Sequence, residues 1–122
     1  MNEALIDACR EGDLVAAADA IRAGADIHCY GDSPMLQAAI HGHYLLVQHL
    51  WLHAPLPRMF HVGQGTLRKA AQRGHTSIVV FLAPFGTASE IEAARHAAVR
   101  AGQEGTALAL ERFQTQQNDN PV

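Results

Sequence analysis

A short phrase recurs along this chain, and the recurrence limits the folds that the chain can adopt. Its copies are Ala8–Asp13, Ala38–His43 and Ala70–His75. Each copy has two small residues, two variable residues, a glycine and a polar residue, and an apolar stretch begins just afterwards. Self-similarity of this kind is typical of repeat proteins, in which similar units stack side by side and build an extended surface for binding partners.

The glycine of each copy sets the period of the repeat. Gly12, Gly42 and Gly74 are separated by steps of 30 and 32 residues, and a degenerate fourth copy places Gly102 a further 28 residues along. Each glycine stands where a short helix must end and the chain reverse, a place that favours a positive φ. Amphipathic segments follow the glycines at residues 14–21, 45–52, 78–82 and 106–113. The pattern predicts eight short helices in four antiparallel pairs.

Around these glycines the chain resembles the ankyrin repeat family, whose usual form runs Thr-Pro-Leu-His, two alanines, two variable residues, Gly-His, an apolar helix and Gly-Ala-Asp. The first copy closes with Ala23–Ile27, the second opens with Ser33–Leu36, and the third carries Thr66 and Leu67. The resemblance implies an all-α, ankyrin-type solenoid of four helix-turn-helix pairs with shortened β-finger connections. The expected domain covers 1–113, with repeats at about 3–32, 33–64, 65–89 and 90–113. The polar stretch 114–122 is expected to be a disordered tail.

Local chemistry predicts two helix starts. Ser33 before Pro34 is a strong start, because the serine hydroxyl can accept from an N–H of the first turn and proline at the first helical position loses no bond. Ser89 and Glu92 have the spacing of a capping box. Both positions fall at the beginning of an expected first helix.

Length and composition narrow the class of protein. A chain of 122 residues is one domain, and no apolar run approaches the ~20 residues that span a membrane. The N-terminus lacks the basic start of a signal peptide, so we expect a cytoplasmic protein. Cys9 is expected at a small core position and Cys29 in a connecting segment, both as reduced thiols. Eight arginines against one lysine, with abundant alanine, suggest a GC-rich bacterial genome.

Charge is divided unevenly along the chain. Residues 1–32 carry a net charge of −5, residues 33–89 hold no acid and carry +4, and residues 90–122 carry −2. The middle segment also holds six of the eight histidines and five of the seven aromatic residues. Because a solenoid places sequence neighbours side by side, these numbers predict a basic, aromatic-rich central band between acidic ends. The alternative interpretation is a solvated face without a partner.

Candidate partner-binding residues follow from the resemblance, which implies binding through the finger tips and the inner face of the first helices. Carried over to this chain, the candidates are Arg10, Tyr30, Ile40, His41, Arg58, Met59, Phe60, His61, Lys69, Gln72 and Arg73. Arginine and aromatic side chains are enriched at binding hot spots. Met59 and Phe60 have an alternative role, which is to fold back and cover the helices. Trp51 is expected to pack in the core.

Catalytic motifs are missing from the sequence. It has no Walker-type phosphate loop, Gly-x-Ser-x-Gly elbow, His-Glu-x-x-His helix or Cys-x-x-Cys pair. His49 and His53 are four residues apart, a spacing that suits zinc, but no cysteine or carboxylate lies nearby in the sequence to complete the shell. We therefore expect no enzymatic activity, no cofactor and no metal. The clustered histidines predict stronger attraction to an acidic partner near pH 6, where they charge together.

The sequence thus favours a protein–protein interaction module, an adaptor or inhibitor that binds an acidic protein surface through its basic, aromatic-rich central repeats. A self-associating structural protein and, less favoured, a nucleic-acid-binding module are the alternatives. Nine lysines and arginines and a pI near 6.2 are low for a protein that binds phosphates. The expected partner is another protein with an acidic surface, and the chain itself is expected to be a monomer or a weak homodimer.

Overall fold

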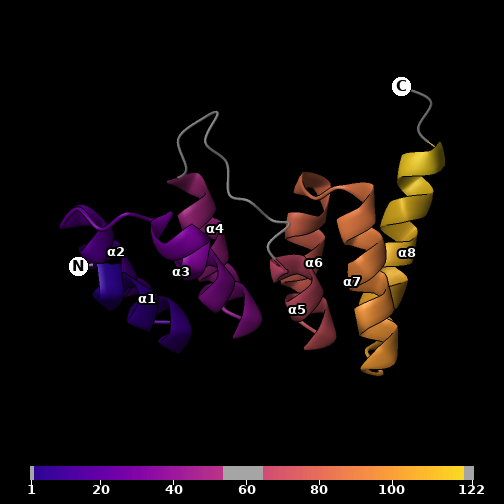
Figure 1. The fold of residues 1–122 in the computed structure, drawn as a ribbon, viewed down its shortest axis with the longest axis horizontal. Coiled ribbons are helices and arrows are strands. Elements are labelled where there is room, and N and C mark those ends of the chain that lie inside the picture. Colours follow the sequence, from indigo (N-terminus) through magenta and orange to yellow (C-terminus); the bar gives the residue numbers. More distant parts are fainter. Residues whose placement is uncertain (1, 54–64, 120–122) are drawn as a thin grey trace. The chain divides into compact units, whose positions relative to one another are not determined.

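The computed structural model describes residues 2–53 and 65–119. Within these ranges it contains eight α-helices, one short 3-10 helix and no strand, which confirms the all-α class (Figure 1). The chain divides into two compact units, unit 1 (Met1–His61) and unit 2 (Val62–Val122). Each unit holds two of the predicted helix pairs. The continuous ankyrin-type stack of all four pairs stays a prediction.

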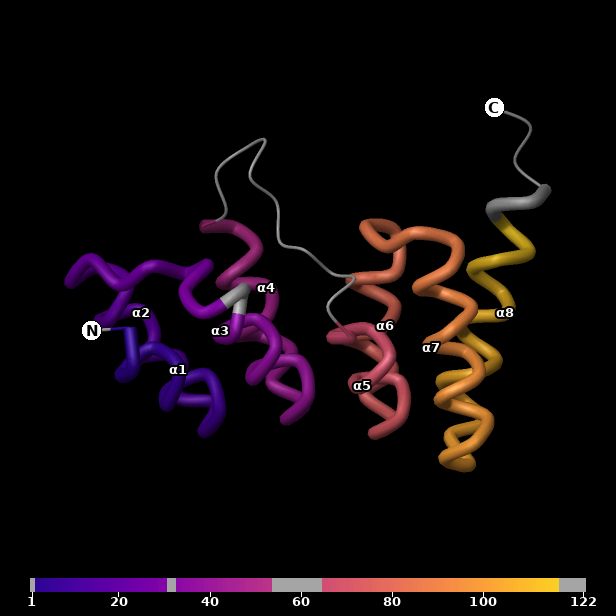
Figure 2. Tube along the Cα trace, viewed as in Figure 1, coloured from indigo at the N-terminus to yellow at the C-terminus, as the bar shows by residue number. Residues whose placement is uncertain are grey.

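Unit 1 is built from two helix pairs. Its helices are α1 (Asn2–Glu11), α2 (Leu14–Arg22), α3 (Cys29–Ile40) and α4 (Tyr44–Leu52). α1 packs against both α2 and α3, so the two pairs are joined through their first helices (Figure 2). Ala8, Ala38 and Ala39 are almost fully buried, and their small side chains let the helix backbones approach closely. Leu46 and Leu50 fill the core from α4.

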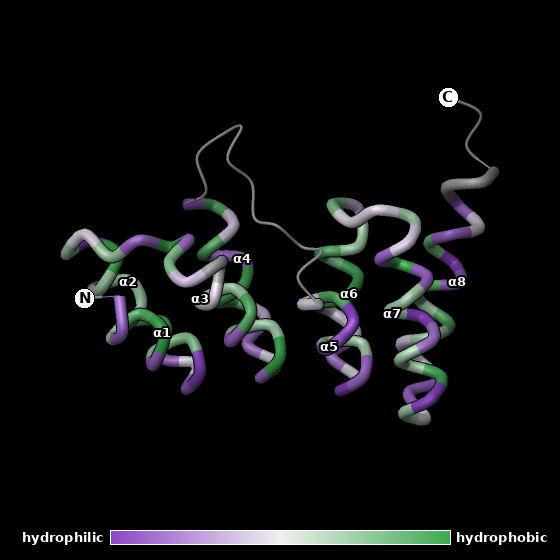
Figure 3. The backbone as a smooth tube through the Cα atoms, viewed as in Figure 1, coloured by the Kyte–Doolittle hydropathy of each residue, from purple (hydrophilic) through white to green (hydrophobic). Residues whose placement is uncertain are grey.

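Unit 2 repeats this plan with longer final helices. Its elements are α5 (Thr66–Gln72), α6 (Thr76–Leu82), the 3-10 helix η1 (Ala83–Phe85), α7 (Ala88–Arg100) and α8 (Glu104–Asp119). α5 packs extensively along α7, and α8 contacts both α6 and α7. Leu82, Ala98 and Leu110 are buried between them. Figure 3 shows that α6 is mostly hydrophobic, whereas the coloured part of α8 that precedes its grey end is mostly hydrophilic.

The four marker glycines end the first helices with the same geometry. Gly12, Gly42, Gly74 and Gly102 have φ of 79°, 78°, 77° and 75°, as expected for a glycine that ends a helix. In all four turns the N–H of the next residue donates to the carbonyl five positions earlier, over 2.8–3.0 Å. This is the bond of a Schellman motif. The degenerate fourth copy is therefore a structural repeat of the other three.

The predicted start of the third helix at Ser33 is wrong. α3 begins at Cys29, and Pro34 lies inside it. A proline cannot donate to the carbonyl four positions earlier, here that of Tyr30. Tyr30 has a φ of 51°, so the first turn of α3 is already irregular. Cys29 is thus a buried helical residue and not part of a connecting segment.

The capping box of α7 lies two residues before the predicted one. The Glu90 N–H donates to Thr87 Oγ1 and the Thr87 N–H donates to Glu90 Oε2, both over 3.1 Å. Thr87 is the cap because its backbone is extended, whereas Ser89 is already helical. Glu92, the expected partner of Ser89, binds elsewhere.

The tail was expected to be disordered from residue 114, but α8 continues to Asp119. Gln114 donates to Glu92 Oε2 over 2.7 Å and Thr115 donates to the Glu111 carbonyl over 3.0 Å. The first of these bonds ties the extra turns of α8 to α7. Polar composition alone therefore did not indicate disorder here.

Candidate functional site

A side chain from the second pair of each unit covers the turn glycine of the first pair. In unit 1 the His43 ring lies over Gly12, so close that a methyl group on Gly12 would come within 2.5 Å of it. His43 Nε2 is 3.0 Å from the Arg10 carbonyl, and because a carbonyl only accepts, Nε2 carries the proton. In unit 2 the Gln103 amide lies over Gly74 in the same way. We call the two covering side chains, His43 and Gln103, lids. They hold the first helices of each unit in register.

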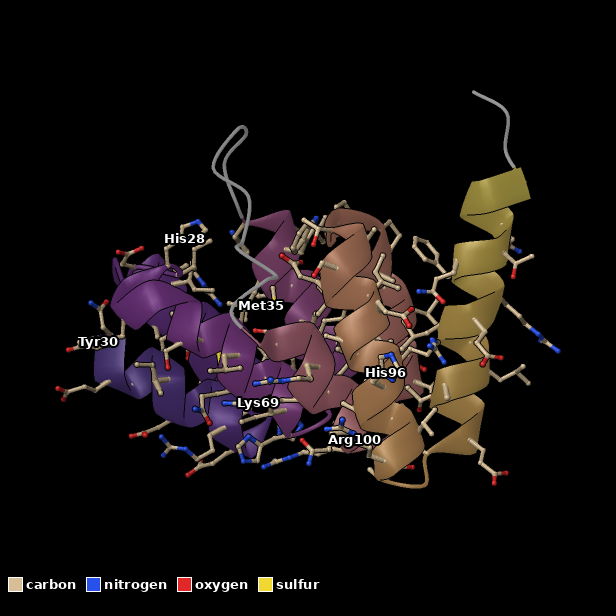
Figure 4. The ribbon with its side chains drawn as sticks, turned by 45° about the vertical axis from the view of Figure 1, so that its right-hand side comes forward. His28, Tyr30, Met35, Lys69, His96 and Arg100 are labelled. Carbon is tan, nitrogen blue, oxygen red and sulfur yellow. The ribbon has the colours of Figure 1, made fainter. Side chains whose placement is uncertain are left out.

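The first helices of unit 2, α5 and α7, pack side by side, and their exposed basic side chains form one face. We call it the α5–α7 face, and its exposed residues are Arg68, Lys69, Gln72 and Arg73 at α5 and His96 and Arg100 on α7. The matching turn glycines are 28 residues apart, so Arg100 is the counterpart of Gln72. Figure 4 shows Lys69 on α5 and His96 and Arg100 on α7. The repeat positions that the resemblance indicates include Arg100, but the sequence analysis selected only Lys69, Gln72 and Arg73 from this face.

Three cations of this face, Arg68, Lys69 and Arg100, differ from the described arginines of unit 1 in their partners. Arg10 pairs with Asp7 at 3.1 Å and Arg22 with Asp19 at 3.2 Å, each three residues earlier on the same helix. Among the described residues, no carboxylate lies within ion-pair distance of Arg68, Lys69 or Arg100. The positive charges of Arg68, Lys69 and Arg100 are thus available to a partner.

The candidates of unit 1 lie on different parts of its surface. Arg10 is exposed on α1, and its backbone carbonyl is the group bound by His43. Ile40 ends α3 half-buried, and His41 follows as the C-cap, its Nδ1 2.9 Å from the Gln37 carbonyl. Tyr30 is 72% exposed and projects from the start of α3 (Figure 4). Its left-handed backbone is unusual for a residue other than glycine.

The remaining candidates, Arg58, Met59, Phe60 and His61, lie outside the described residues. Their predicted role in binding stays a prediction, as does the alternative that Met59 and Phe60 cover the helices. Trp51, expected in the core, is half-buried in α4. The aromatic part of the predicted central band is therefore described only in part.

An ionic network around Glu92 of α7 borders the basic face and includes His96. Glu92 accepts from Arg95 and from Gln114, and its Oε1 is 3.0 Å from His96 Nε2. The bonds from Arg95 and Gln114 lower the pKa of Glu92 from 4.5 to about 2. Arg95 also reaches Glu111 on α8 at 3.7 Å. The network joins α7 to α8 and leaves Arg100 outside it.

Burial shifts the pKa values of two titratable groups of unit 1. Burial, with Cys29 nearby, raises the pKa of the Cys9 thiol from 9.0 to about 12, so it is a packing residue and not a nucleophile. Burial and the neighbouring His53 lower the pKa of His49 below its ordinary 6.5. The two rings meet edge to face with centroids 4.6 Å apart. In the described part of the chain, no group of three or more His, Cys, Asp or Glu side chains has the arrangement of a metal site.

An apolar groove lies on the second-helix side of unit 2. It has a volume of about 210 Å³ and lies between α6, η1 and α8. Its lining residues are Val80, Ala83, Ala109, Leu110, Arg112, Phe113 and Gln116. Its lining is mostly apolar, with Arg112 and Gln116 as the polar side chains.

Comparison with protein-family models and with curated proteins gives no match to this chain. The ankyrin assignment therefore depends on the residues quoted above. None of the helices in the described ranges has the length and apolar character needed to cross a membrane.

Proposed function

We propose that this chain is a protein–protein interaction module that binds an acidic protein surface through the α5–α7 face. The observation that carries the proposal is that three exposed cations without ion-pair partners within the described residues, Arg68, Lys69 and Arg100, lie on the neighbouring helices α5 and α7, whereas the other such cation, Arg112, lies on α8. Cations that already hold a carboxylate gain little from a new one, whereas these retain their full attraction for a partner. The module acts by occupying the partner's surface, as an adaptor or inhibitor does.

Rigidity of the surface supports the same role. α5 and α7 are fixed side by side by buried alanines and by the Gln103 lid over Gly74. Side chains on fixed helices lose less freedom on binding than side chains on a loose segment, so more of the interaction energy appears as affinity. A rigid pair of helices suits recognition better than it suits chemistry, which needs several groups converging on one point.

Charge also favours protein over nucleic acid as the partner. Unit 1 has seven acids against three arginines, and unit 2 has five acids against six lysines and arginines. The whole chain has a net charge of −3, and phosphate binding generally recruits more cations than unit 2 offers. An acidic protein patch of limited size can instead bind the α5–α7 face alone.

The test is fluorescence anisotropy with a labelled oligo-glutamate peptide, with oligo-glutamine as the neutral peptide. Lys69→Ala/Arg100→Ala should weaken binding of oligo-glutamate roughly three- to tenfold, since each exposed ion pair contributes about 0.2–1 kcal/mol. The matched control is Arg22→Ala/Arg112→Ala, which removes the same charge from exposed positions elsewhere and should leave affinity unchanged.

Two outcomes would contradict the proposal. Equal weakening by both variant pairs would show a response to net charge and not to the α5–α7 face. Tighter binding of a random single-stranded oligonucleotide than of oligo-glutamate, with a steep loss on adding salt, would favour the nucleic-acid module instead.

A further inference from the structure

Carboxylates form a regular row along α1. Glu3, Asp7 and Glu11 are four residues apart and all exposed. Residues at this spacing lie on one side of a helix, about 6 Å apart along its axis. Of the three, Asp7 pairs with Arg10. The outer side of α1 is therefore a helix surface with one carboxylate on each turn.

A row of cations with the same spacing stands on the α5–α7 face. Lys69 and Arg73 are four residues apart at α5, and Arg100 is exposed on the neighbouring α7. Packed helices lie about 8–10 Å apart, so a helix laid across α5 and α7 meets side chains of both. Its carboxylates then come at the same interval as Lys69 and Arg73.

We propose that the α5–α7 face binds an acidic α-helix with a carboxylate on each turn, and that α1 of a second copy of this chain is its occupant. The proposal deepens the proposed function and rests on it, since it names the partner of the same surface. Charge complementarity selects this occupant: unit 1 has a net charge of −4 and unit 2 of +1. Each copy thus carries both halves of the contact.

Exposed ion pairs set the strength of this association. Each contributes little, and salt screens charges over about 10 Å at 0.1 M. The contact between copies is therefore weak and sensitive to salt. A partner with a denser row of carboxylates than α1 displaces the second copy. Self-association therefore occupies the α5–α7 face only until that partner binds.

The experiment is sedimentation velocity of the full chain at about 20 mM and about 0.5 M salt, concentrations on either side of effective screening. The wild type should associate in the first buffer, with a dissociation constant at least about tenfold larger in the second. Two variants reverse one half of the contact each. Glu3→Lys/Glu11→Lys changes the α1 row, and Lys69→Glu/Arg100→Glu changes the α5–α7 face.

Each reversed variant alone should be monomeric, because like charges then replace opposite charges at two positions of the contact. An equimolar mixture of the two should associate again, since the unchanged α1 row of one variant can bind the unchanged α5–α7 face of the other. Circular dichroism checks the fold, and Glu3→Gln/Glu11→Gln replaces the lysine variant if that one unfolds. The glutamine variant alone should associate at least about threefold more weakly than the wild type, in line with the loss of two exposed pairs.

The outcomes separate this inference from the proposed function. A wild type that stays monomeric at low salt, yet binds oligo-glutamate through Lys69 and Arg100, overturns the second copy as occupant and leaves the proposed function standing. Failure to bind oligo-glutamate overturns both. Association that persists in the reversed variants, or that does not respond to salt, also overturns the inference.

Discussion

Unit 1 and unit 2 close their helix turns with the same geometry and different side chains. In unit 1 an imidazole ring lies over Gly12, and in unit 2 a primary amide lies over Gly74. Both lids bond to a carbonyl near the end of the preceding first helix, at 3.0 Å for His43 and 3.4 Å for Gln103. His43 and Gln103 occupy the same repeat position, directly after a turn glycine. The imidazole ring of His43 is rigid, whereas the Gln103 amide stands at the end of a flexible side chain and can move aside.

Their surfaces differ more than their cores. Both units bury alanines at the same repeat positions, Ala38 and Ala39 in one and Ala70 and Ala71 in the other. Unit 1 carries seven acids and pairs its described arginines, whereas Arg68, Lys69 and Arg100 on the α5–α7 face of unit 2 have no carboxylate within ion-pair distance among the described residues. The comparison shows that small buried residues and turn glycines set the scaffold, while the variable positions are left to set the charge.

Alanine at the turn glycines gives the largest expected effect and tests the stiffness of the lids. Gly102→Ala places alanine at a positive φ without a steric clash, so it should lower the free energy of unfolding by about 1 kcal/mol. Gly12→Ala adds a clash with the His43 ring and should cost about 2–4 kcal/mol. Gly74→Ala should fall between, because the Gln103 amide can rotate away. Urea denaturation followed by circular dichroism measures all three, and equal losses would refute a difference between ring and amide.

Mild acid should weaken unit 1 through His49. Its folded pKa lies below the ordinary 6.5, so the unfolded chain takes up the proton first and stability falls as pH drops below 6.5. His49→Leu removes this proton uptake. The fall in urea midpoint between about pH 7.5 and about pH 5.5 should therefore be smaller in the variant than in the wild type. The same fall in both proteins would assign the acid sensitivity to other groups.

Stronger acid should act on unit 2, through Glu92, with the smallest effect of the three. The pKa of Glu92 is about 2 in the folded chain, whereas its ordinary value, which applies to the unfolded chain, is 4.5. The contribution of Glu92 to the free energy of unfolding is therefore complete above pH 4.5 and is lost as the pH falls toward 2. The carboxylate is partly exposed, which makes the contribution modest and sensitive to salt. Glu92→Gln should flatten the pH dependence of thermal unfolding in this range, with Glu104→Gln as the exposed control. A curve unchanged from the wild type would show that the α7–α8 network adds no stability.

Local patterns in the sequence were enough to predict the helix pairs and their turns. A glycine that ends a helix needs only its own backbone preference, so Gly12, Gly42, Gly74 and Gly102 were placed correctly. The start of a helix depends on which of several polar residues has an extended backbone. In α7 this residue is Thr87 and not Ser89. The bond from Gln114 to Glu92 joins residues 22 positions apart, so no local window could have predicted that α8 continues.

The candidate surface was predicted in part. Lys69, Gln72 and Arg73 were selected because they follow the repeat, and they are exposed as expected. Arg100 holds the same repeat position as Gln72 but was not selected; it lies in a segment with net negative charge, although Glu92 of that segment is bound to Arg95 and Gln114. Net charge per segment cannot express such pairings, since they are set by which side chains meet on neighbouring helices.

The uncovered glycine of the last turn has a consequence for protein engineering. Gly102 has the same φ as its counterparts, yet no atom lies within 4 Å of where its side chain would be. An appended helix pair that places a glutamine or histidine just after its own turn glycine would supply the missing cover. The array can in this way be lengthened by grafting at α7 and α8, with the new side chain setting the register.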